Sequence, residues 1–96
     1  MPGMKHDCGG AAGLLFAFKN IVQQAPTQNF HLLLCLAENS VASNATRPDD
    51  IITMYSGKTV EVNNTDCEGR LAVGDGVAYA CKDLKHSSKM ISPILV

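Results

Sequence analysis

Apolar residues recur at three- and four-residue intervals in two parts of the chain, which is the spacing of one face of an α-helix. The first part, 8–25, has Lys, Asn and Gln residues between its apolar positions. Pro26 blocks its continuation, because proline lacks the backbone N–H that a helix requires. The second part, 69–84, contains Gly74 and Gly76, each of which weakens a helix by about 1 kcal/mol relative to alanine. We therefore predict two helices, with the second weakened by its glycines.

Three other stretches have the pattern of β-strands. Residues 29–37 are almost continuously apolar, which is typical of a strand covered on both faces in a mostly parallel sheet. Residues 51–55 and 58–62 flank a Ser-Gly pair and predict a tight hairpin. The tail 89–96 is a possible last strand, restricted to an edge or an end by Pro93. The order of elements predicts an α/β fold.

Composition and charge exclude several classes of function. The formal net charge is −1, and Lys and Arg are scattered, so we expect neither a nucleic-acid partner nor a membrane partner. The longest apolar run is too short to span a bilayer, and the first residues lack a secretory pattern, so we expect a cytoplasmic protein. Four widely spaced cysteines predict free, buried thiols in a reducing compartment: Cys8, Cys35, Cys67 and Cys81.

The stretch 63–71 has the residues with the clearest chemistry. Asp66 and Glu68 could both turn toward one divalent cation at the start of a helix, and Arg70 could hold an anion beside it. On pattern alone, a helix cap with solvated charges is the more common arrangement. Asp7 leaves the same two alternatives open, a metal ligand or a helix cap. Two further acids are candidates to anchor loops, Glu38 and Asp75.

The longer string Asn-Thr-Asp-Cys-Glu-Gly-Arg-Leu, residues 64–71, resembles the signature of the leucine (cytosol) aminopeptidase family of two-metal metallopeptidases, family M17. Cys67 stands where that family usually has alanine. The similarity runs in register from about Met4 to Leu84 and is most like an animal aminopeptidase-like branch of the family. Its other matching segments are 4–12, 35–39, 47–50 and 56–62.

The resemblance implies a fold and an assembly. We expect a partial three-layer α/β fragment of a mostly parallel, mixed sheet flanked by helices, from the C-terminal catalytic domain of the family. All of 1–96 would belong to this fragment, with the family match over about 4–84 and a divergent tail over 85–96. The family assembles as homo-hexamers, so we expect the same partner here.

The resemblance also implies roles for single residues. It assigns Asp7, Asp66 and Glu68 as ligands of two divalent ions, zinc or manganese. Arg70 matches the catalytic arginine, which is thought to hold a bicarbonate. The pocket for the first side chain of the substrate would include Met4 and either Asn63 or Asn64, of which we select Asn64.

The implied function is release of N-terminal amino acids, of leucine type, from peptides with a free N-terminus by a metal-activated water. The family also uses two upstream lysines and a bridging aspartate that the 96 residues do not contain, so we expect the isolated chain to be inactive. One alternative is a non-catalytic truncated product that binds or interferes with full-length subunits. Another is a magnesium-dependent phosphoryl-transfer site, which lacks the expected glycine-rich loop.

Overall fold

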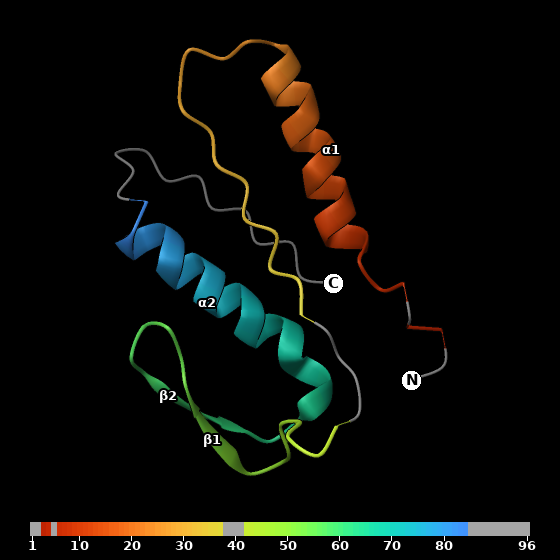
Figure 1. Cartoon of the computed structure of the whole chain (residues 1–96), viewed down its shortest axis with the longest axis vertical. Helices are drawn as coiled ribbons and strands as arrows, with labels where there is room; N and C mark the ends of the chain where they lie inside the picture. Colours follow the sequence, from red (N-terminus) through yellow and green to blue (C-terminus); the bar gives the residue numbers. More distant parts are fainter. Residues whose placement is uncertain (1–2, 5, 38–41, 85–96) are drawn as a thin grey trace.

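A computed structural model describes residues 3–4, 6–37 and 42–84 of the chain. It confirms both predicted helices and the predicted hairpin, and it adds a short 3-10 helix before the second α-helix (Figure 1). The elements in chain order are α1 (Gly9–Gln23), β1 (Asp50–Thr53), β2 (Thr59–Val62), η1 (Thr65–Cys67) and α2 (Glu68–Lys82). The predicted strand over 89–96 lies outside the described residues.

The molecule is flat, with principal extents of 46 × 33 × 17 Å. An α-helix with its side chains is already about 10 Å thick, so the thickness leaves no room for three layers. The sole sheet of the described residues is the two-stranded antiparallel hairpin, and the parallel three-layer arrangement is not seen there. Val62 is the only buried hydrophobic side chain in the same part of the chain, and it is still 5% exposed. These residues therefore form a small α/β unit with both broad faces open.

Helix α1 begins one residue later than predicted and ends before the proline. Its N-cap is Cys8, which makes no side-chain capping bond. At the other end, the N–H groups of Gln24 and Ala25 donate to the carbonyls of Ile21 and Val22 at 3.1 Å. Ala25 then adopts a positive φ of 47°, which turns the chain out of the helix before the proline.

The predicted strand over 29–37 is wrong for this structure, because these residues form no sheet. Figure 1 shows them as an extended segment between α1 and α2. A strand is defined by backbone bonds to a neighbour, and the two strands of the hairpin bond only to each other. Between Leu32 and Ala37 the only backbone–backbone hydrogen bond to another described residue is local, from the Leu36 N–H to the Leu34 carbonyl at 3.0 Å.

The hairpin pairs Asp50 with Val62 and Thr53 with Thr59. The turn is closed by the N–H of Met54, which donates to the Lys58 carbonyl, and by the N–H of Gly57, which donates to the Met54 carbonyl, both at 2.8 Å. Gly57 has a φ of +86°, a conformation that side chains with a β-carbon rarely adopt. The Ser-Gly pair therefore fixes the hairpin where the sequence predicted it.

Helix α2 lies between the hairpin and the extended segment (Figure 1), and two glycines allow the close approach. A β-carbon at Gly74 would lie 3.4 Å from the terminal methyl of Met54, which is ordinary contact. A β-carbon at Gly76 would overlap the Sγ of Cys35. The two glycines that weaken the helix intrinsically thus let neighbours on either side pack against its backbone.

Tyr55 fastens the tip of the hairpin to the last two turns of α2. Its backbone N–H donates to Asp75 Oδ1 and its hydroxyl donates to Asp83 Oδ2, both at 2.8 Å. Its ring meets Tyr79 edge-on at 5.9 Å, and the Nζ of Lys82 lies 5.2 Å from its centroid. The anchoring role predicted for Asp75 is confirmed, whereas Glu38 lies outside the described residues.

Two predictions from composition can be compared with the structure. All four cysteines are free, as predicted, but none is buried: two are exposed and two are half-buried. The flat arrangement explains the difference, since one layer cannot cover every apolar side chain. Neither α1 nor α2 is long and apolar enough to cross a membrane, and no other helix of the described residues is.

The two glycines of α2 give a matched pair of variants. We expect Gly74→Ala to stabilise the chain by about 1 kcal/mol, the usual gain in helix propensity. Gly76→Ala should instead destabilise it by about 1–2 kcal/mol, because the overlap with Cys35 outweighs the same gain. Urea denaturation followed by circular dichroism measures both changes.

Cys35→Ala provides the control for this pair, since it removes the Sγ that the new methyl would meet. In the Cys35→Ala background, Gly76→Ala should stabilise the chain by about 1 kcal/mol, as Gly74→Ala does. Destabilisation by Gly76→Ala that is the same with or without Cys35 would show that the contact is not responsible.

The hydrogen bond to Asp83, reinforced by partial burial and by the negative charge of Asp83, raises the pKa of Tyr55 above its ordinary value of 10.0. The neutral phenol is thus favoured in the folded chain. Its stabilisation should be complete below the pKa of an unfolded tyrosine and lost as pH rises through the higher folded pKa. Titration of tyrosinate absorbance should show one group with a raised pKa, and this group should disappear in Tyr55→Phe and return toward 10.0 in Asp83→Ala.

Candidate functional site

The predicted metal ligands of the central motif lie where η1 runs directly into α2. Asn64 is extended, and its side-chain Oδ1 accepts a hydrogen bond from the N–H of Asp66 at 2.9 Å. Its carbonyl also accepts the N–H of Cys67 at 3.3 Å. Asn64 therefore caps η1 and fixes the backbone that carries Asp66. The family resemblance implied a place for Asn64 in a substrate pocket, and the cap was not predicted.

The two acidic residues of the motif lie at the N-terminal end of α2. Asp66 is exposed within η1, and Glu68 is half-buried as the first residue of α2. The N–H groups at the start of α2 carry a partial positive charge that favours both carboxylates. Among the described residues, no Lys or Arg forms an ion pair with either acid. Their negative charge is thus held in place without being neutralised by a side chain.

One oxygen of Glu68 is buried at the start of α2. Its Oε2 is buried and has no hydrogen-bond partner in the described part of the chain. A buried carboxylate oxygen without a partner is unfavourable by several kcal/mol, on the order of the desolvation of a charged group. Together with the exposed Asp66, it offers the oxygen donors that hard and borderline divalent cations prefer. The carboxylates at this helix end therefore fit a metal ion.

Arg70 is the third residue of α2, within its first turn, and is exposed. Its Nη2 donates to the Sγ of Cys67 at 2.8 Å, so the guanidinium folds back over the start of the helix. This contact exists because Cys67 stands where the resembled family has alanine. The sequence signal was present, since residues three apart on a helix are neighbours.

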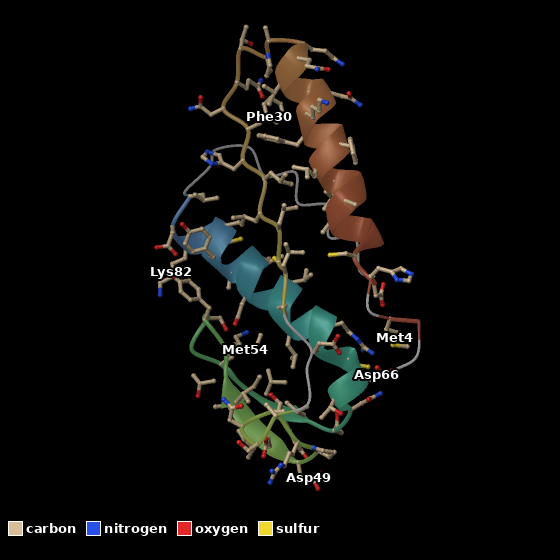
Figure 2. The ribbon with its side chains drawn as sticks, turned by 45° about the vertical axis from the view of Figure 1, so that its right-hand side comes forward. Met4, Phe30, Asp49, Met54, Asp66 and Lys82 are labelled. Atoms are coloured by element: carbon tan, nitrogen blue, oxygen red, sulfur yellow. The ribbon has the colours of Figure 1, made fainter. Side chains whose placement is uncertain are left out.

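Asp7 and Met4 lie at the start of α1, and both are exposed. The N–H of Asp7 donates to the Met4 carbonyl at 3.1 Å, and Asp7 is not the N-cap of α1. Both views put the starts of α1 and α2 on the same side of the molecule, with Met4 and Asp66 labelled there in Figure 2. However, the described residues contain no group of three His, Cys, Asp or Glu side chains placed to hold a metal. The described residues therefore show Asp66 and Glu68 two positions apart at the start of α2, without a three-ligand group that includes Asp7.

The sequence is similar to known aminopeptidases over most of its length. Residues 1–92 match the catalytic domain of the cytosol aminopeptidase family. The chain is 67% identical over 84 residues to the probable aminopeptidase NPEPL1 of Homo sapiens, which covers 88% of this chain and 16% of that protein. It is 56% identical over 88 residues to leucine aminopeptidase 1 of Caenorhabditis elegans, covering 92% of this chain and 18% of that protein. The chain therefore spans about a sixth of the length of these relatives. No solved structure matches it.

The cap at Asn64 predicts how the start of α2 responds to substitution. Asn64→Ala should destabilise the chain by about 1 kcal/mol, because the N–H of Asp66 loses its acceptor. Asn63→Ala is the matched control and should be neutral, since Asn63 is exposed and accepts no hydrogen bond from the described residues. Urea denaturation of both variants measures the difference. Equal effects of the two substitutions would contradict a capping role.

Proposed function

The chain belongs to the cytosol aminopeptidase family, and on this basis we propose that it forms part of the active site of a metal-dependent aminopeptidase. The substrates would be peptides with a free N-terminus, from which the enzyme releases the first residue, leucine among others. The observation that carries the proposal is the unpartnered Oε2 of Glu68 beside Asp66, both within the family motif. An oxygen that the protein leaves without a donor is suited to a cation.

Three carboxylates of this chain would hold two divalent ions, zinc or manganese: Asp7, Asp66 and Glu68. The ions, when bound, supply the Lewis acidity that lowers the pKa of a water and polarises the scissile carbonyl. Asn64 and the start of α2 hold Asp66 and Glu68 in place before any ligand arrives. Asp7 would join them from the start of α1.

Arg70 would stabilise the negative charge that develops on the carbonyl oxygen, directly or through a bound bicarbonate. Its hydrogen bond to Cys67 limits the rotamers available to its long side chain and keeps the guanidinium at the mouth of α2. Met4 and Asn64 would line the pocket for the first side chain of the substrate. We further propose a homo-hexameric assembly in the cytoplasm, as expected from the family.

A chimera tests the proposal. The 84 matched residues of the human relative are replaced by those of this chain, and hydrolysis of leucine anilide is measured with Mn²⁺ or Zn²⁺. We expect an active chimera whose kcat/KM falls by about a hundredfold or more in Glu68→Gln, because a carboxylate of the proposed metal site is lost. Glu61→Gln in β2 is the matched control and should leave kcat/KM unchanged. An active chimera that tolerates Glu68→Gln would refute the assigned role.

We expect the 96 residues by themselves to be inactive toward leucine amide and leucine anilide with either metal. The family's bridging aspartate and its two lysines are not among them, and the three matched carboxylates without these ligands are too few to hold two ions. Calorimetric titration should show at most one weak site for Mn²⁺ or Zn²⁺. Turnover by the purified chain that disappears in Glu68→Ala would contradict this expectation.

A second candidate is a non-catalytic role in which the chain binds full-length subunits. The exposed apolar side chains of α1 and of the extended segment favour it, because such surfaces mark sites of association. The measurement that separates the two is addition of the purified chain to the full-length human relative. Loss of aminopeptidase activity on addition would support the non-catalytic role. Unchanged activity would contradict that role, and only the catalytic proposal would remain.

A further inference from the structure

The N-cap of helix α2 is Cys67, which stands between the two acidic residues of the candidate site (Figure 2 labels Asp66). A residue at this position is usually Ser, Thr, Asp or Asn, because its side-chain oxygen accepts a backbone N–H of the first turn. Cys67 makes no such capping bond. Its half-buried side chain instead accepts a hydrogen bond from Arg70, whose Nη2 lies 2.8 Å from Sγ. The thiol therefore serves the arginine side chain rather than the helix backbone.

The contact between Cys67 and Arg70 is local. Helical side chains tilt toward the N-terminus, so a long side chain three residues into a helix reaches back over the N-cap. The first turn of α2 places both residues, and the contact involves only the side chains at its two ends. The pairing thus depends on residues 67–70 alone and on no more distant part of the chain.

The hydrogen bond leaves the rest of the guanidinium available to a ligand. A guanidinium has five N–H donors, and Arg70 gives one of them to the Sγ of Cys67. A thiol sulfur is a weak acceptor, so it competes poorly with an anion for the other donors. Within the described ranges, Arg70 forms no ion pair with Asp66 or Glu68, which stay available to a cation. The contact restrains the arginine and blocks neither kind of ligand.

We propose that Cys67 is a positioning residue for Arg70. Its Sγ holds the guanidinium over the first turn of α2, and the arginine then loses less conformational freedom when negative charge develops beside it. This role rests on the proposed function, in which Arg70 stabilises that charge, and Cys67 acts only through Arg70. The alanine that the family usually has at this position offers no acceptor, so the positioning belongs to this chain.

A double-mutant cycle in the chimera tests the role in catalysis. Cys67→Ala should lower kcat by about three- to tenfold and change KM by less than about twofold, because Arg70 acts on charge that develops only in the transition state. In an Arg70→Ala background, Cys67→Ala should lower kcat by less than about twofold, since the residue that it positions is gone. Cys81→Ala is the matched control, because Cys81 is the other cysteine at α2, and it should leave kcat unchanged.

An active chimera in which Cys67→Ala has no effect would overturn the proposal. So would an equal loss of kcat with and without Arg70, which is the result expected if Cys67 only supports the structure of the helix. An inactive chimera would count against the proposed function alone. The positioning of Arg70 would then be decided by a measurement that requires no activity.

That measurement is the ¹⁵N order parameter of the Arg70 side chain in the purified 96-residue chain. The chain has two arginines, so its spectrum has two Nε signals, which Arg70→Lys assigns. We expect the order parameter of Arg70 Nε to fall in Cys67→Ala. That of Arg47 Nε should stay unchanged, because its guanidinium donates to the Ser43 carbonyl. An Arg70 side chain as mobile in the wild-type chain as in Cys67→Ala would overturn the proposal.

Discussion

The fold depends on the packing of helix α2 against neighbours on two sides. On one side, Met54 reaches the backbone at Gly74, and Tyr55 bonds to Asp83 near the end of the helix. On the other side, Cys35 approaches Gly76. An isolated helix of this length with two interior glycines is marginal in water. These contacts therefore stabilise α2, and through α2 they determine where the hairpin and the extended segment lie.

The candidate site depends on the same helix through its first turn. Asp66, Cys67 and Glu68 follow one another at the point where η1 becomes α2, so their side chains are placed by the start of a helix. Asn64 secures that start with a short-range hydrogen bond. The contacts of Tyr55 with Tyr79, Lys82 and Asp83 lie at the opposite end of α2, away from the candidate site. The contacts that anchor the hairpin and the residues of the candidate site thus lie at opposite ends of α2.

What the sequence could predict follows from the range of each interaction. Helical spacing and Pro26 bounded α1, and the Ser-Gly pair before Lys58 located the hairpin, because these signals act within a few residues. The contact of Arg70 with Cys67 was equally local and could have been read from the spacing. The hydrogen bond from Tyr55 to Asp83 joins residues that are 28 positions apart, and no sequence pattern predicts it. The segment 29–37 was assigned to a sheet from its composition, but its strand partners are not specified by its own residues.

The thickness of 17 Å has a consequence for how the chain unfolds. Because the described residues bury only one apolar side chain, Val62, they expose little additional surface when they lose their order. The denaturant slope and the heat capacity change of unfolding both scale with that newly exposed surface. The chain should therefore lose its structure over a wide range of urea concentration and temperature.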